Sequence, residues 1–169
     1  LLPDRVDNQA LIGASNDRIY DSSMAYLEQN NPNFVLIGWS DAGRMQVHNK
    51  ETGKWNQLNS IGVGHVPTAL EPLTKLLKDK MSWGSDHYKH MAFYWHYKIY
   101  NMHSYLLYRN IPHLFFTALS MWTGKNNITI EDKYKLDWNN NYFEVYNDCY
   151  MSWCMRNNYR QVTPGWYHF

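Results

Sequence analysis

The sequence predicts a three-layer α/β/α domain with a mainly parallel sheet. Three apolar runs of strand length, 10–13, 34–38 and 113–119, alternate with segments that have the periodicity of amphipathic helices. The order is strand, helix, strand, a long excursion, helices, strand and helix. Neighbouring strands that are joined by a helix run parallel, and such connections are right-handed. We therefore expect one sheet with helices packed on its faces.

Length and composition limit the possible classes of protein. The 169 residues predict a single domain spanning 1–169 with a substantial core. The net charge of +1 gives no reason to expect nucleic acid or an anionic membrane as a partner. No apolar stretch reaches the roughly 18–20 residues needed to span a bilayer. We therefore expect neither nucleic acid nor a membrane as partner.

The first strand and helix have clear local signals. The run at 10–13 predicts a strand, and Ser15 or Asn16 can cap the helix predicted over 16–29. Residues 30–32, Asn-Asn-Pro, end this helix. Its apolar stripe is formed by Tyr20, Met24 and Leu27.

The next segment combines a strand with an irregular region. The continuous apolar run at 34–38 is typical of a strand buried on both faces. Residues 41–65 contain several turn-forming residues and predict a long excursion, with a hairpin around 50–53. Excursions of this length in a compact domain are usually functional or partly disordered.

The second half predicts three helices and a third strand. Residues 67–80 form a short amphipathic pattern, and the longest helix covers 85–109. Residues 110–112 end it, 113–119 form the third strand, and 141–157 form the last helix. The long helix should face the sheet with Met91, Trp95, Ile99, Met102 and Leu106.

The sequence predicts structural roles for the cysteines and histidines, with neither a disulfide nor a metal site. Cys149 and Cys154 lie five apart in a predicted helix, which does not match disulfide geometry and favours reduced thiols. Of the histidines in the long helix, only His87 and His90 have the spacing of metal ligands on one face. No carboxylate completes the set, so we expect solvated or hydrogen-bonded histidines and no metal.

Two predicted strand ends carry a glycine that is followed, after one further residue, by two polar residues. These are residues 13–16, Gly-Ala-Ser-Asn, and residues 38–41, Gly-Trp-Ser-Asp. In an α/β protein such junctions lie at the carboxyl edge of the sheet, where ligands bind. The alternative is that both are ordinary strand ends. The first turn has neither the Lys-Ser/Thr ending of a phosphate loop nor the glycines of a dinucleotide fingerprint, so we expect no cofactor.

Three short blocks in order along the chain resemble one enzyme family. Asn8 is followed by Gly13 after a short apolar run, residues 38–41 end an apolar strand, and His168 follows the turn at 164–165. These blocks resemble those of the SGNH (GDSL-like) hydrolases, in particular small members encoded by tailed phages. The third block has serine where the family has Asn, and the last has glycine where the family has Asp. The resemblance implies a flavodoxin-like fold.

The resemblance also implies a chemistry, acyl transfer from an ester through a serine nucleophile. Gly13 and Ser40 would be the oxyanion donors and His168 the general base. Asn16, Trp39 and Asp41, beside these positions, would contact the substrate, an ester-bearing small molecule or carbohydrate.

The family's nucleophile block, Gly-Asp-Ser, belongs before Asn8 and is not among residues 1–169. Ser15 is the nearest serine, but it follows the wrong strand. We therefore expect a chain clipped at both ends and inactive as written. Two functions stay open: an SGNH-type esterase or deacetylase, or a catalytically silent phage virion or accessory module that holds carbohydrate or protein. Either implies the cytoplasm of an infected host cell or the virion, with an assembly partner possible in the virion.

Overall fold

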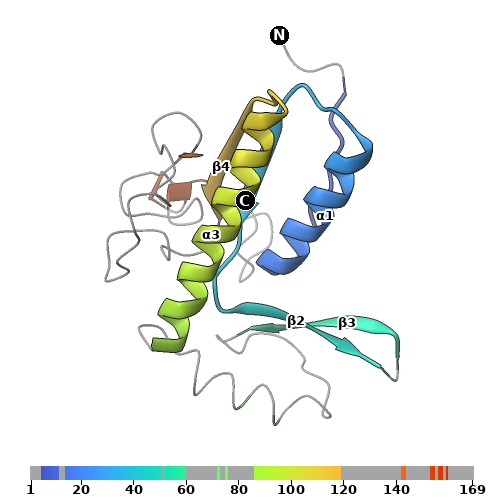
Figure 1. The fold of residues 1–169 in the computed structure, drawn as a ribbon. Coiled ribbons are helices and arrows are strands. Elements are labelled where there is room, and N and C mark those ends of the chain that lie inside the picture. The colour runs from blue at the N-terminus through green and yellow to red at the C-terminus, as the bar shows by residue number, and fades with distance from the viewer. Residues whose placement is uncertain are drawn as a thin grey trace.

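The computed structural model describes helices, a small parallel sheet and a separate antiparallel hairpin (Figure 1). The described residues are 5–11, 14–50, 52–59, 72, 75, 86–118, 142–143, 153–154, 156–157 and 159. The expected α/β character is therefore confirmed for these parts of the chain.

The parallel sheet has the strand order β1-β4-β5. Strand β1 (Val35–Trp39) pairs in parallel with β4 (His113–Thr117), and Ile37 lies opposite Phe115. This pairing confirms the second and third predicted strands, with ends shifted by one or two residues. Strand β5 (Tyr142–Phe143) pairs in parallel with β4.

Strand β5 corrects the prediction that residues 141–157 are all helical. Tyr142 and Phe143 lie beside Phe115 and Phe116, so pairing with a neighbouring strand overrides the helical pattern at this point. Trp153 and Cys154 are helical as expected, and Cys154 is a buried free thiol. Cys149 lies outside the described residues.

Helix α1 (Asn16–Gln29) has the predicted bounds. Its cap is Ser15, whose hydroxyl accepts a hydrogen bond from the Arg18 N–H at 3.4 Å. The helix ends at Asn30, which is extended. Local capping and a local stop signal therefore suffice to set both ends.

Helix α3 (Asp86–Tyr108) is the long predicted helix. Two residues after its end, Asn110 has the left-handed conformation, with φ of 55°. The Ile111 N–H donates back to the Leu106 carbonyl at 2.9 Å. This is the hydrogen-bond pattern of a helix that stops at a left-handed C-terminal residue. Of the helix predicted over 67–80, only Pro72 and Lys75 are described, and both are helical.

Strands β2 (Arg44–Asn49) and β3 (Lys54–Asn59) form the antiparallel hairpin expected around residues 50–53. Gly53 has φ of +64°, the left-handed conformation that glycine adopts without steric cost. The hairpin is a sheet of its own. In Figure 1 it lies below the start of α1, and α1 contacts β2.

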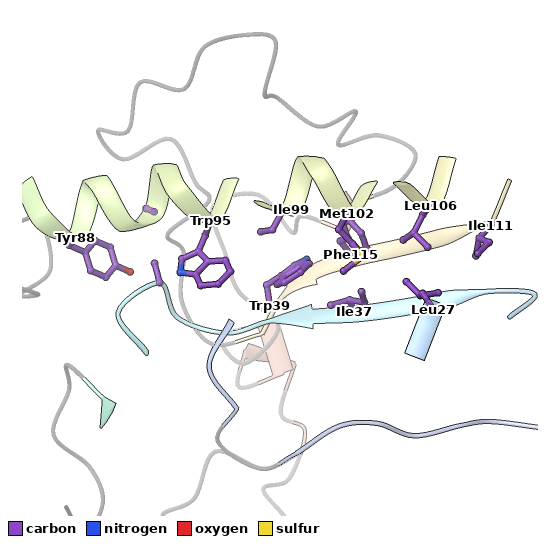
Figure 2. Close-up of a cluster of buried hydrophobic side chains, with 12 residues drawn as sticks. Leu27, Ile37, Trp39, Tyr88, Trp95, Ile99, Met102, Leu106, Ile111 and Phe115 are labelled. Atoms are coloured by element: carbon purple, nitrogen blue, oxygen red, sulfur yellow. The ribbon is translucent and has the colours of Figure 1, made fainter. Parts of the chain in front are cut away.

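The core lies between α3 and the parallel strands, as Figure 2 shows. The predicted stripe of α3 supplies much of it, and Leu27 contributes from α1. The described members of this cluster are Leu27, Ile37, Trp39, Ala42, Tyr88, Ala92, Trp95, Ile99, Met102, Leu106, Ile111 and Phe115. Met91 is partly buried against it.

One expectation for β1 is wrong. The apolar run predicted burial on both faces, but burial alternates along the strand. Ile37 is 5% exposed and faces the core, whereas its neighbour Leu36 is 59% exposed on the opposite face. On that opposite face Gly38 lies under the ring of Phe116, where an added Cβ would come within 2.6 Å of the ring.

The strand predicted at 10–13 is not confirmed. Ala10 and Leu11 are described and belong to no strand, and Leu11 is 55% exposed. Residues 12 and 13 lie outside the described part of the chain. The Ala14 N–H donates to the Leu11 carbonyl at 3.1 Å, so these two residues lie close together directly before α1.

Candidate functional site

Polar side chains gather where β1 and β4 end and α1 begins. We call Ser15, Asn16, Ser40, Asp41 and Thr117 the carboxyl-edge cluster. Each of these residues is at most 3% exposed. Burying polar groups costs free energy unless they are hydrogen-bonded, so the contacts of the cluster decide what it can do.

Asn16 joins the two predicted glycine junctions. The Ser40 N–H donates to Asn16 Oδ1 at 2.7 Å, and Asn16 Nδ2 donates to the Ser40 carbonyl at 3.2 Å. One amide side chain therefore satisfies both main-chain groups of the residue that follows β1. This reciprocal pair fixes the first turn of α1 against the end of the strand.

Asp41 organises the loop that leads from β1 into the hairpin. Its Oδ1 accepts from the Gly43 N–H at 2.7 Å, and its main-chain carbonyl accepts from the Arg44 N–H at 3.1 Å. Its Oδ2 accepts from the Tyr88 hydroxyl at 3.1 Å. The loop is thus held by its own turn and by the first turn of α3.

Two charged groups near this edge have shifted pKa values. Burial lowers the pKa of the Arg44 guanidinium, and the negative charge of Asp41 opposes this shift. In α1, burial raises the pKa of Asp17, and the nearby charge of Asp21 adds to the increase. The N–H groups at the start of α1 favour negative charge at this edge.

The structure describes some of the predicted site residues and not others. Ser40, Asp41 and Asn16 come together in the carboxyl-edge cluster. Gly13 and His168 lie outside the described residues, so their expected positions stay predictions.

Trp39 is buried, as are Asn16 and Asp41, so the predicted contact of these three residues with a substrate stays a prediction. Trp39 is 0% exposed and packs edge-on against Phe115 at 5.7 Å between centroids. Its side chain belongs to the core under α3 (Figure 2). The alternation of side chains along a strand accounts for this, because Trp39 shares its face with Ile37.

Sequence reasoning missed two residues of this edge. Tyr88 is buried and donates to Asp41, and Thr117, the last residue of β4, is buried and pairs with Trp39 at the end of β1. A signal for Tyr88 was present, because it lies four residues before Ala92 and seven before Trp95, on the buried stripe of α3. A tyrosine on such a stripe usually has a partner for its hydroxyl.

The histidines of α3 behave as expected for solvated or hydrogen-bonded side chains. His87 and His90 are exposed. His96 is buried, and its Nδ1 lies 2.7 Å from the Ala92 carbonyl. Because a carbonyl only accepts, Nδ1 carries the proton. Burial lowers the pKa of His96 to about 4, so it is neutral at pH 7.

His103 and His113 form a second hydrogen-bonded arrangement. His113 Nδ1 lies 2.9 Å from the Ile111 carbonyl, and its Nε2 lies 2.8 Å from His103 Nδ1. In the neutral pair, His113 donates to the carbonyl and accepts from His103. Among the residues that the structure describes, no three His, Cys, Asp or Glu side chains are grouped to hold a metal ion. The expectation of no metal at His87 or His90 stays a prediction.

Comparison of the chain with protein-family models, curated proteins and solved structures gave no significant match. Within the described parts of the chain, no helix is both long and apolar enough to cross a membrane.

Proposed function

We propose that this chain carries the oxyanion-stabilising part of an SGNH-type serine ester hydrolase, on a flavodoxin-like three-layer fold. The reciprocal hydrogen bonds between Asn16 and Ser40 are the main support. They hold Asn16, three residues after the block that resembles the second family block, against Ser40 of the block that resembles the third, directly after β1 of the parallel pair. This is the edge at which open α/β sheets bind ligands.

In this proposal the ester carbonyl binds beside Gly13 and Ser40. A serine attacks the carbonyl carbon while His168 takes its proton, and the carbonyl oxygen becomes negative. The Gly13 N–H and the Ser40 hydroxyl donate to that oxygen. The alcohol leaves with the proton from His168, and water then releases the acid. Removing one such donor typically costs about 10²–10³-fold in rate.

Asn16 and Asp41 support the donors in this proposal. The amide of Asn16 bonds both main-chain groups of Ser40, so Asn16 positions Ser40. Asp41 holds the turn that follows, through Gly43 and Tyr88. The substrate is an ester-bearing small molecule or carbohydrate.

The nucleophile is tested by comparing residues 1–169 with a longer chain that adds an upstream Gly-Asp-Ser block. The measurement is hydrolysis of p-nitrophenyl acetate, including the burst phase. The shorter chain should match background, and the longer chain should gain several orders of magnitude in rate because triad members act as a unit. Equal rates for the two chains would contradict the proposal.

Variants of the longer chain then separate the roles. His168→Ala should remove nearly all activity, and Ser40→Ala should lower kcat by roughly 10²-fold or less. The matched control is Ser104→Ala, an exposed serine on α3. A loss in the control equal to that in Ser40→Ala would contradict the role of Ser40.

A second candidate is a non-catalytic virion or accessory module of an infected cell that uses exposed aromatic side chains. The supporting observation is Trp55, which is 60% exposed on the hairpin, while Trp39 and Trp95 are buried. An inactive longer chain with a ligand bound at Trp55 would favour this candidate.

A further inference from the structure

The hairpin has two different faces. Side chains alternate along each strand, so Met45 and Val47 share one face and His48 lies on the other. Met45 and Val47 are half-buried, and so are Arg44 and Gln46 on the face of His48, whereas His48 itself is exposed. Trp55 is directly opposite His48 in the register and is 60% exposed. The outward face of the hairpin therefore carries an aromatic pair.

The two rings of this pair support each other. Their centroids are 5.2 Å apart, and the planes are tilted by 59°. Cross-strand aromatic pairs stabilise a hairpin, yet this pair leaves most of the indole in water. An exposed tryptophan held in a fixed orientation by its neighbour is a preformed contact surface.

The pair lies on the hairpin, which follows Asp41 of the carboxyl-edge cluster in the chain. Strand β2 begins at Arg44, whose N–H donates to the Asp41 carbonyl at 3.1 Å. Helix α1 contacts β2, and Figure 1 places the hairpin below the start of α1 and the end of β1. The strand that carries His48 thus begins three residues after Asp41.

We propose that His48 and Trp55 bind one ring of a neutral saccharide. The C–H face of a sugar packs on an indole, and its hydroxyls pair with polar side-chain groups such as an imidazole. Gln46, on the same face as His48, adds an amide with both functions.

Other partner classes fit this face less well. A nucleic acid needs a row of cations, and the net charge of the chain is +1. A stable protein interface needs about 800 Å² on each side, far more than one pair of rings offers. The position of the sugar beside an ester site rests on the proposed function, but saccharide binding itself does not.

The test uses residues 1–169 and three neutral probes: hexa-N-acetylchitohexaose, cellohexaose and xylohexaose. Saturation-transfer NMR and calorimetry report binding at millimolar or tighter affinity. At least one probe should bind, and Trp55→Ala should weaken it about tenfold or more, whereas Trp55→Phe keeps a ring and should lose less. Tyr108→Ala, which removes an aromatic ring that is 87% exposed on α3, should bind like the parent chain.

Three outcomes would overturn the inference. These are no binding of any probe, binding unaffected by Trp55→Ala, and an equal loss in Tyr108→Ala. Trp55-dependent binding of oligothymidylate, or Trp55-dependent dimerisation without saccharide binding, would also overturn it. Trp55-dependent saccharide binding in a longer chain that hydrolyses no ester would support this inference and contradict the proposed function. Ester hydrolysis without saccharide binding would do the reverse.

Discussion

The two ends of the β1–β4 pair differ in the kind of side chain that is buried there. At the carboxyl end, buried polar residues from three segments meet: Asn16 bonds to Ser40, and Asp41 bonds to Gly43 and Tyr88. At the amino end, aliphatic side chains close the core, and Leu106 and Leu27 are at most 1% exposed. Figure 2 places Leu27, Leu106 and Ile111 together where β1 begins.

Polar groups at the amino end mainly join elements to one another. Arg109 donates to main-chain carbonyls of Leu27 and Asn30 and so satisfies the end of α1. His103 and His113 bond to each other and to a carbonyl. At the carboxyl end the bonds instead converge on one loop, residues 40–44. This difference indicates that the amino end serves the fold and that the carboxyl end holds one loop in a defined position.

The largest expected effect on stability is at the amino end. Leu106 is 0% exposed, so Leu106→Ala leaves a cavity and should lower the free energy of unfolding by about 2–5 kcal/mol. The matched control is Leu107→Ala on the next residue of α3, which is 52% exposed and should change it by less than about 0.5 kcal/mol. Urea unfolding measures both. Equal changes in the free energy of unfolding for the two variants would mean that Leu106 is not buried in the core at this end.

At the carboxyl end, Asn16→Ala removes both hydrogen bonds to Ser40 and leaves a buried N–H without its acceptor. The free energy of unfolding should fall by about 2–4 kcal/mol. Asn33→Ala, at an exposed loop asparagine before β1, is the control and should have little effect. If Asn16→Ala is as mild as the control, the carboxyl edge is not held together by this pair.

Acid is expected to act on the buried His96. Its pKa is about 4 in the folded chain against 6.5 for the ordinary group. The unfolded chain therefore binds more protons between these values, and stability falls as the pH drops from about 6.5 to about 4. This contribution is about 2–3 kcal/mol.

His96→Gln should reduce the loss of stability between pH 7 and pH 4 by that amount, measured by urea unfolding at both pH values. His90→Gln, at an exposed histidine of the same helix, should leave the loss unchanged. If the variant at position 96 keeps the full acid sensitivity of the parent chain, His96 is not its source.

The parts of the fold that the sequence predicted well depend on local signals. Helix 16–29 has its cap at Ser15 and its stop at residues 30–32, and the turn of the hairpin has Gly53. The failures involve pairing between distant segments. Strand β5 exists only because residues 142–143 lie beside β4, and no periodicity spans two residues. The apolar run 34–38 did not indicate which of its faces would be covered.

The candidate site was predictable in its location but not in its bonding. The order of strands and helices placed residues 13–16 and 38–41 at one edge, and the contact between Asn16 and Ser40 agrees with this. Asp41, in the loop after β1, accepts from Tyr88, which lies 47 residues further along the chain on helix α3. Such a contact depends on the packing of α3, which sequence spacing does not specify. Trp39 lies beside the site in the sequence, but alternation along β1 turns its ring into the core.

The smallest effect should come from the single bond between Tyr88 and Asp41. Tyr88→Phe keeps the ring in the core and removes only the hydroxyl, so it should cost about 1–2 kcal/mol. Tyr94→Phe, at a 40% exposed tyrosine of the same helix, is the control. The informative measurement is hydrogen exchange at the Gly43 and Arg44 amides, which bond to Asp41.

If α3 holds the loop through this bond, both amides should exchange faster in Tyr88→Phe, and more than the change in global stability accounts for. An equal loss of protection at all amides would mean that the hydroxyl only contributes to the core. The carboxyl end would then resemble the amino end, with bonds that serve the fold and no separately positioned loop.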